Sequence, residues 1–279
     1  MRLLFFVLLI FSFDVQSKIP EPGYGLPELA SEARIKELNS KKRAKVMTPS
    51  VQRKMQRVLE ALDEAGILEQ EQALLKKEKK DKEAEAKDKE IAKAIANGQR
   101  ELDDLKTRLA SLQSYDRSMY YYYSAYYNLA YQDKISEAMN NYVKLVAEKD
   151  TAEKLRVNAY YVLAQLYLSE SNYESGLDYL LRWFKNTAEV NPDGYVLLGQ
   201  AYYLLADKES TKSKVLASYQ KAYNNMVEAK RLADEKQIRF RENWYSLLLA
   251  SMSELELKEE QVPLYEEILE LYPKKKYFV

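Results

Sequence analysis

Carboxylates are the side chains of this sequence to consider for acid–base chemistry, because it contains no cysteine and no histidine. This excludes thiol nucleophiles, the Ser-His-Asp arrangement, and thiolate or imidazole metal sites. A pair such as Glu242 and Glu254 could serve acid–base catalysis. Nothing places such a pair in an apolar pocket, however, and 43 acidic residues make chance pairs common. We therefore expect no enzymatic activity, no cofactor and no metal site.

Tyrosine is the other distinctive residue, with 24 copies in 279 residues. A dense group lies between positions 115 and 131. On a helix, Tyr122 and Tyr126 share one face with Leu129, and we expect that face to be core. Tyrosine offers a large amphipathic surface with little side-chain entropy to lose, which suits protein recognition. The remaining tyrosines of the group are therefore candidates for partner binding.

The helical pattern of the sequence is clearest from Val157 to Phe184. Apolar residues at spacings of three and four begin at Tyr160 and predict a helix, polar residues 169–172 interrupt the stripe, and a second apolar helix follows. Small Ala164 and Gly176 would allow two antiparallel helices to approach closely. The pattern matches the tetratricopeptide (TPR) signature of about 34 residues, with Tyr160, Ala164 and Gly176 replacing its Trp, Gly and Ala.

One such unit cannot bury its own apolar face, so neighbouring units are required. Similar helical pairs are predicted from Tyr122 to Leu145, from Tyr195 to Ala222, and from Tyr245 to Leu269. Small Gly199 occupies the position of Ala164 in its own unit. These matches predict a right-handed solenoid of helical hairpins. The alternative is a helical bundle without repeats.

In a TPR array one face of each first helix lines a concave groove. We predict that this groove binds a protein partner through the following residues: Tyr120, Tyr123, Tyr127, Tyr131, Asn158, Tyr161, Gln165, Val196, Gln200, Tyr203 and Asn243. These positions hold no Lys or Arg, which disfavours a clamp for a C-terminal carboxylate and favours a peptide backbone or the flank of a helix. The alternative is that the tyrosines pack beneath the helices around Met55 and Leu102.

Residues 1–17 have the features of a secretory signal peptide. A positive start precedes an apolar run from Leu3 to Phe13, and Val15 and Ser17 are small enough for the −3 and −1 positions of a cleavage site. The run is short of the ~20 residues that span a bilayer. We expect a mature start at Lys18 in the periplasm, without stable membrane insertion. The alternative is an uncleaved anchor.

Residues 18–50 contain several prolines and are expected to form a flexible lead, with a short helix from Leu29 to Leu38. A basic cluster occupies residues 41–45. The charge of the whole chain is balanced, with 43 basic and 43 acidic residues, which argues against general nucleic-acid binding. We therefore interpret the cluster as part of a solvated linker.

Residues 51–114 carry apolar stripes at 55–62 and 102–112, separated by a charged stretch. Residues 76–90 contain only Lys, Glu, Asp and Ala, which predicts a solvent-exposed helix that projects from the body. We interpret the two stripes as halves of an irregular first repeat, split by this insertion. The alternative is one continuous coiled coil from 51 to 112.

Several blocks resemble those of periplasmic TPR proteins encoded beside TonB–ExbB–ExbD systems of Gram-negative bacteria. The most specific are RWF…PDGYVLL and ENW…LYPKKKYF, and the resemblance covers residues 44–62 and 115–279. The charged stretch 66–97 departs from it, and so does the end, because family members usually run on for several more repeats. The resemblance implies an accessory of TonB-dependent uptake, for example of ferric siderophores, and no catalytic residue.

The sequence thus predicts an all-α protein in which TPR-like repeats at 115–279 follow a charged helical segment at 51–114. Its expected role is a non-catalytic periplasmic scaffold for protein partners such as TonB-, ExbB- or ExbD-type components. The alternatives are a coiled-coil spacer of the envelope and a subunit of an envelope enzyme. The last repeat is expected to expose Leu264, Ile268 and Leu271 for self-association or docking. The alternative is that the last repeat is the end of a truncated array.

Overall fold

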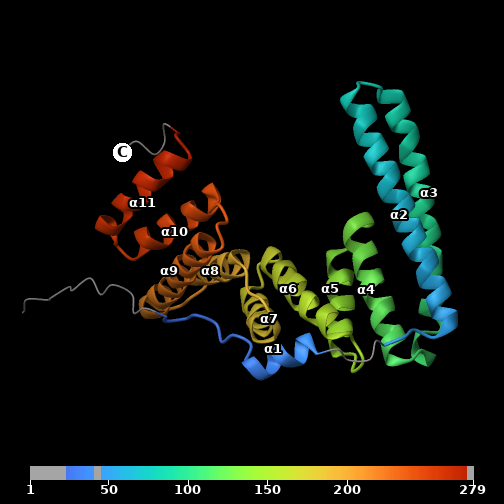
Figure 1. The fold of residues 1–279 in the computed structure, drawn as a ribbon, viewed down its shortest axis with the longest axis horizontal. Helices are drawn as coiled ribbons and strands as arrows, with labels where there is room; N and C mark the ends of the chain where they lie inside the picture. Colours follow the sequence, from blue (N-terminus) through green and yellow to red (C-terminus); the bar gives the residue numbers. More distant parts are fainter. Residues whose placement is uncertain (1–22, 41–44, 275–279) are drawn as a thin grey trace, which may run out of the picture. The chain divides into compact units, whose positions relative to one another are not determined.

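The computed structural model describes residues 23–40 and 45–274, and these form α-helices, one short 3₁₀ helix and no strand (Figure 1). The elements are α1 (Glu32–Asn39), α2 (Pro49–Lys77), α3 (Asp81–Thr107), η1 (Leu109–Ser111), α4 (Ser114–Tyr131), α5 (Ile135–Ala147), α6 (Glu153–Ser169), α7 (Tyr173–Asn186), α8 (Pro192–Ala206), α9 (Lys212–Glu235), α10 (Glu242–Glu254) and α11 (Lys258–Leu271). Consecutive helices pack in pairs from α2–α3 to α10–α11. The predicted all-α class is confirmed.

The chain divides into two compact units. The larger unit is Pro27–Val190, and the smaller unit is Asn191–Val279 together with Met1–Leu26. The predicted signal peptide, at residues 1–17, and residues 41–44 of the basic cluster lie outside the described residues. Within the described residues, no helix combines the length and the apolar character needed to cross a membrane.

In the larger unit, α2 and α3 form an antiparallel hairpin that extends past α4 and α5 in Figure 1. The chain reverses at residues 78–80, where Lys79 adopts a left-handed φ of 58°. Met55 of α2 and Leu102 of α3 meet in one buried cluster, so the two predicted apolar stripes do pack on each other. They can meet only if the chain turns back midway between them. The predictions of one continuous helix over 76–90 and of one coiled coil over 51–112 are therefore wrong. The predicted exposure of residues 76–90 is confirmed for nearly all of them.

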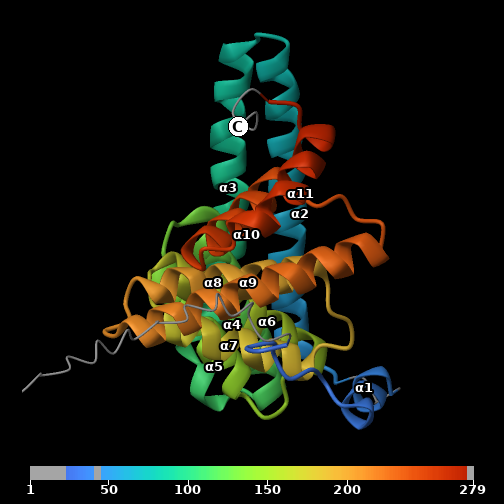
Figure 2. The ribbon, with the colours of Figure 1, turned by 90° about the vertical axis from the view of Figure 1, so that its left-hand side faces the viewer.

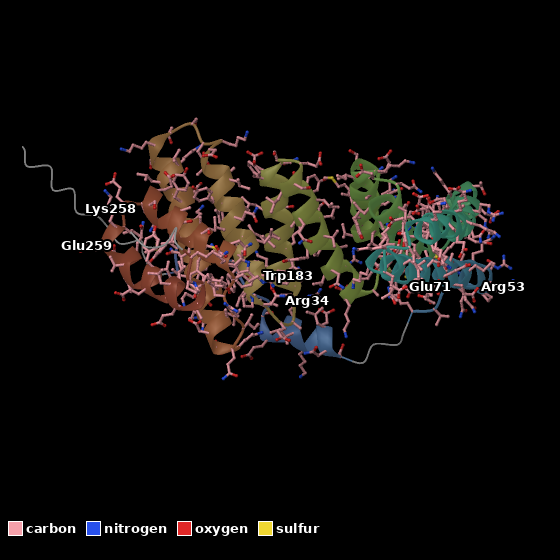
Figure 3. All side chains as sticks on the ribbon, turned by 90° about the horizontal axis from the view of Figure 1, so that it is seen from above. Arg34, Arg53, Glu71, Trp183, Lys258 and Glu259 are labelled. Carbon is pink, nitrogen blue, oxygen red and sulfur yellow. The ribbon has the colours of Figure 1, made fainter. Side chains whose placement is uncertain are left out.

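The outer half of the hairpin is held by small and charged residues. Ala65 of α2 and Ala84 of α3 are buried, which lets the helices approach closely. The Lys87 ammonium lies 2.8 Å from the Glu71 carboxylate across the pair. Figure 3 shows the dense charged side chains of this hairpin, with Arg53 and Glu71 labelled. Such exposed ion pairs contribute little individually, so the outer hairpin depends on helix propensity and close approach.

The α6–α7 pair has the turn that the sequence predicts at residues 169–172. Ser171 adopts a left-handed φ of 59°, and the Asn172 side chain caps α7 by accepting from the Ser175 amide at 3.2 Å. A Cβ placed on Gly176 would lie 2.7 Å from the Leu168 side chain and 3.3 Å from the Ala164 carbonyl oxygen. The predicted close approach at Ala164 and Gly176 is confirmed.

Helix α1 confirms that a short helix lies in the lead, although it begins at Glu32 and not at the predicted Leu29. It contacts the same pair of helices. The Arg34 guanidinium donates to Asn186 of α7 at 3.0 Å and to Glu153 of α6 at 2.6 Å. Arg34 and Trp183 are labelled in Figure 3. Just before α1, the Ala30 amide donates to the Phe184 carbonyl at 3.1 Å. This part of the lead is therefore ordered by α6 and α7.

In the smaller unit, α8 and α9 lie side by side in Figures 1 and 2. A Cβ on Gly199 of α8 would lie 2.9 Å from the Met226 sulfur and 3.2 Å from the Ala222 carbonyl oxygen of α9. The predicted approach at Gly199 is confirmed, because this glycine sits where two helices touch.

Helix α11 folds back on α10, which turns its apolar residues inward. Leu264 and Ile268 are 8% and 0% exposed, so the prediction that both would be exposed is wrong. Leu271 remains 39% exposed and Val262 57% exposed. The pair closes on itself through Tyr245, whose hydroxyl donates to Glu267 at 2.7 Å. The apolar surface left for self-association is smaller than the sequence indicates.

Candidate functional site

The tyrosines of α4 fall mostly beneath the α2–α3 hairpin. Tyr120 and Tyr127 are 6% and 1% exposed and belong to the cluster that contains Met55 and Leu102. Tyr123 and Tyr131 are half-buried against the same cluster. For these four residues the structure thus matches the alternative of packing beneath the hairpin, and it corrects their placement in an open groove. Burial raises the pKa of Tyr127 and of Tyr131 to about 12.

The predicted core face of α4 is also displaced. Tyr122 is half-buried against the α4–α5 cluster as expected, whereas Tyr126 is 41% exposed. The buried positions Tyr120 and Tyr127 are seven residues apart, two helical turns, and mark the face that the hairpin covers.

The remaining predicted groove residues lie in both units, so their alignment in one groove stays a prediction. In the larger unit, Asn158 and Gln165 are exposed on α6, and Tyr161 is half-buried 5.0 Å from the ring of Trp183. In the smaller unit, the predicted groove residues Gln200 and Asn243 are exposed. Val196 and Tyr203 are half-buried. The Tyr203 ring lies 5.2 Å from that of Tyr219.

A different site is hollowed between α3, α4 and α5. It is a cleft of about 350 Å³ that we call the amide cleft. Its lining residues are Gln99, Asp103, Lys106, Leu109, Tyr120, Tyr121, Ser124, Asn128, Gln132, Lys134, Glu137, Asn140, Asn141 and Lys144. Five of these side chains are carboxamides, and lysines and carboxylates stand among them. The lining thus offers many hydrogen-bond donors and acceptors with a mixture of charges.

Part of the amide cleft is already hydrogen-bonded and part is open. The Gln132 amide donates to Gln99 at 2.7 Å, which joins α4 to α3. Asn128, Asn140 and Asn141 make no side-chain hydrogen bond to another described residue. A carboxamide both donates and accepts, so it can pair with the amide and the carbonyl of a peptide backbone. These three side chains are therefore free to bind an extended chain.

Aromatic and cationic groups border these amides. The Lys144 ammonium lies 5.9 Å from the centre of the Tyr121 ring, within the range of a cation–π contact. Burial raises the pKa of Tyr121. Its hydroxyl, like that of an ordinary tyrosine, is protonated at neutral pH and can donate a hydrogen bond. Of the cleft residues, only Tyr120 was in the predicted groove. The adjacent Asn140-Asn141 was the available signal, because neither residue is needed for the apolar stripe of its helix.

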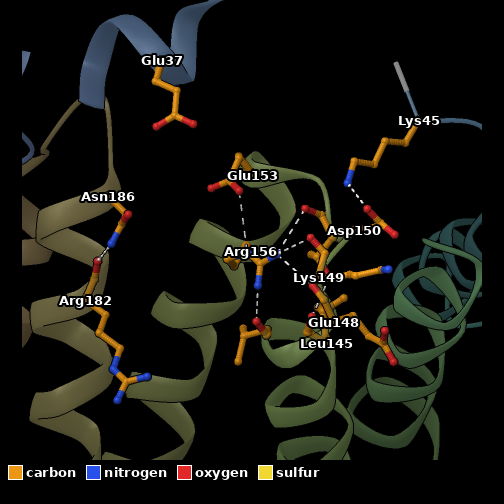
Figure 4. Close-up of polar contacts among 12 residues, drawn as sticks. Glu37, Lys45, Leu145, Glu148, Lys149, Asp150, Glu153, Arg156, Arg182 and Asn186 are labelled. Carbon is orange, nitrogen blue, oxygen red and sulfur yellow. Dashed lines mark hydrogen bonds and ion pairs between the residues drawn. The ribbon is translucent and has the colours of Figure 1, made fainter. Parts of the chain in front are cut away.

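A polar network beside the cleft fixes α4, α5 and α6 relative to one another. The Arg117 guanidinium donates to both carboxylate oxygens of Glu148, at 2.6 and 2.9 Å. The hydrogen bond from Arg117 is the main reason that the pKa of Glu148 is lowered. Arg156 donates to the carbonyls of Val146 and Glu148 at the end of α5, as Figure 4 shows. The Lys45 ammonium lies 2.8 Å from the Asp150 carboxylate. Figure 4 labels both residues and marks this contact.

The carboxylates considered for catalysis are not brought together. Glu242 and Glu254 begin and end α10, a separation of roughly 18 Å along a helix. Glu242 instead pairs with Lys274. No group of acidic residues in the described ranges is arranged to hold a metal ion.

Comparisons of the chain with protein-family models, with curated proteins and with solved structures found no match.

Proposed function

We propose that this protein is a non-catalytic scaffold of the TPR type that binds an extended segment of a protein partner in the amide cleft. The observation that carries the proposal is the group Asn128, Asn140 and Asn141, three polar side chains without partners among the described residues. Their amides match the alternating donors and acceptors of a peptide backbone. The succession of helical pairs supports the repeat architecture within which such clefts form.

The chemistry of the lining favours a polar, extended ligand over an apolar helix. A helix uses its own backbone groups internally and would offer the asparagines only side chains. Lys106 and Lys134 stand with Asp103 and Glu137 in the same lining, so a segment of mixed charge is suited to it.

The proposed cellular setting is the periplasm, and the proposed partners are components of a TonB–ExbB–ExbD system. Support for both comes from the sequence: the apolar run with Val15 and Ser17, and the blocks that resemble periplasmic TPR proteins. The proposed scaffold acts through its repeats, without a cofactor. Analysis of the mature N-terminus by mass spectrometry tests the export step, because an intact Met1 would contradict it.

A spacer is the second candidate, and the hairpin argues against it. A spacer benefits from length, and α2 with 29 residues is about 44 Å long before the chain reverses. A single helix over the same segment would reach about twice as far. The reversal at residues 78–80 therefore gives up the reach that a spacer would use.

The test compares two matched pairs of substitutions in the full chain. Asn140→Ala with Asn141→Ala removes amides from the cleft, and Asn158→Ala with Gln165→Ala removes amides from the exposed face of α6. Chains carrying an affinity tag are incubated with cell-envelope extract, and the retained proteins are compared. We expect the wild type and the α6 variant to retain the same defined partner, and the cleft variant to lose it.

The other outcomes are equally informative. Loss of the partner by the α6 variant alone would assign binding to the groove predicted from the sequence and not to the amide cleft. Retention by both variants would overturn both sites. Recovery of the chain mainly with itself would favour the spacer.

A further inference from the structure

The N-terminal lead is held by α9 through its backbone. The Asn224 side chain donates to the Tyr24 carbonyl at 2.9 Å, and the Asn225 side chain donates to the Gly25 carbonyl at 3.1 Å. Both asparagines are buried, at 7% and 0% exposed. All of these residues belong to the smaller unit. Two neighbouring asparagines that donate hydrogen bonds to successive backbone carbonyls form a site suited to a peptide.

The lead enters this site as a tight turn. The Leu26 amide donates to the Gly23 carbonyl at 3.2 Å, and Gly25 has a φ of 78°. A turn with a left-handed third residue requires glycine there, and Gly25 supplies it. A Cβ on Gly25 would lie 2.2 Å from Cγ of Lys221, so the turn is also pressed against the stem of this lysine. Only glycine fits by both criteria.

A cation between two aromatic rings completes the site. The Lys221 ammonium lies 5.6 Å from the Tyr24 ring and 5.2 Å from the Tyr202 ring of α8. Tyr202 is buried and Tyr24 is 41% exposed. The site therefore recognises a tyrosine on the turn, while the outer side of that ring stays open to solvent.

One polar atom of the site has no hydrogen-bond partner among the residues that the structure describes. Nδ2 of Asn225 donates to two carbonyls, those of Gly25 and Lys221, whereas its Oδ1 is buried and accepts no hydrogen bond from any described residue. A buried acceptor without a donor is unfavourable. The lead thus uses the donors of the site and leaves an acceptor available for a backbone amide. A ligand that offers both groups would bind better than the lead does.

We propose that this surface of α8 and α9 is a peptide-binding site, and that residues 23–26 are an internal ligand that blocks it. The ligand that fits is a protein segment with a Gly-Tyr-Gly turn or a close equivalent, recognised through two carbonyls and one tyrosine ring. The lead lies after the predicted cleavage site and so stays in the mature chain. Displacement of the lead makes the site available, which gives the chain a means to regulate partner binding.

The test uses the full chain and a fluorescently labelled peptide with the sequence of residues 19–28, IPEPGYGLPE. Gly25→Ala introduces a Cβ against Lys221 and should release the lead without changing α9. Gly66→Ala is the matched control, because nothing lies within 4 Å of a Cβ at that position in α2. We expect the Gly25→Ala chain to bind the peptide at least tenfold more tightly than the wild type and the control.

Two further changes keep the result decisive. A peptide with alanine at the positions of Tyr24 and Gly25 should not bind. Asn224→Ala in the Gly25→Ala chain should abolish binding, and Lys221→Ala serves the same purpose if the first variant loses its helical circular dichroism. Equal and weak binding by the wild type and a folded Gly25→Ala chain would overturn the proposal, as would binding unaffected by both α9 changes. Because these residues lie outside the larger unit, this result is independent of the amide cleft.

Discussion

The hydroxyl of Tyr127 on α4 ends directly over Gly98 on α3. A Cβ placed on this glycine would lie 1.8 Å from the hydroxyl oxygen and 2.8 Å from Cζ of the ring. Tyr127 is 1% exposed, and Cβ of Ala61 on α2 lies 3.1 Å from the same Cβ position. The contact between the α2–α3 hairpin and α4 therefore requires glycine at position 98, because any side chain there would collide with Tyr127.

The first prediction is that Gly98→Ala destabilises the chain. In a helix this change alone is favourable by about 1 kcal/mol, but here it forces the Tyr127 ring out of its site. We expect a net loss of roughly 1–3 kcal/mol in the free energy of unfolding, measured with urea. The control is Gly66→Ala in α2, which meets open space and should stabilise by up to about 1 kcal/mol. Equal effects of the two changes would show that Tyr127 does not pack on Gly98.

The second prediction concerns the hydroxyl itself, which has no hydrogen-bond partner among the described residues. Tyr127→Phe removes an unsatisfied buried group and should leave stability unchanged or raise it by about 1 kcal/mol. Tyr245→Phe is the matched control, because that hydroxyl donates to Glu267 at 2.7 Å and its removal should cost about 1 kcal/mol. A clear loss in Tyr127→Phe would mean that its hydroxyl is bonded after all.

The contact at Gly98 also explains what sequence reasoning could and could not provide. The helical pairs follow from spacing, because residues such as Leu163, Leu180 and Leu198 are apolar and must be buried. On α4 tyrosines occur on both faces, so the pattern does not distinguish Tyr126, which is exposed, from Tyr127, which is buried. The α2–α3 hairpin decides between them, and periodicity within α4 carries no information about it.

The two candidate sites differ in the same way. The Asn140-Asn141 pair of the amide cleft stands out in the sequence once α5 is placed, because neither residue belongs to its apolar stripe. The hydrogen bonds from Asn224 and Asn225 to the carbonyls of residues 24 and 25 join positions that are 200 apart in the chain. No local pattern encodes such a contact, and the prolines around residue 22 indicate only an irregular lead.

The third prediction is a loss of stability at alkaline pH. Burial raises the pKa of Tyr127, Tyr131, Tyr142 and Tyr219 to about 12, against 10.0 for an ordinary tyrosine. The unfolded chain releases these protons near pH 10 while the folded chain retains them. Stability is therefore fully present below pH 10 and falls as the pH rises toward 12. Tyrosinate absorbance at 295 nm should rise together with the loss of helical circular dichroism.

A control for this effect is Tyr142→Phe, which removes one of the four groups. It should move the alkaline unfolding midpoint upward, provided that the variant is folded at pH 8. Smooth titration of all tyrosines near pH 10 in a chain that keeps its helical signal would contradict the raised pKa values of these four side chains.

The last prediction concerns Glu148, for which stability is lost at acidic pH and not at alkaline pH. The hydrogen bond from Arg117 lowers the pKa of this carboxyl below its ordinary 4.5, so its contribution to stability is present above pH 4.5 and is lost as the pH falls through the lowered value. Glu148→Gln should cost about 1.5–3 kcal/mol at pH 7, because hydrogen bonds to a charged group are lost, and less at pH 3. Asp178→Asn is the control, because its ion pair with Arg182 is about half exposed on both sides and should contribute less than 1 kcal/mol. Urea unfolding of the three chains at both pH values measures the difference. If the gap between Glu148→Gln and the wild type is the same at pH 3 and pH 7, the Arg117–Glu148 pair does not fix the ends of α4 and α5 by its charge.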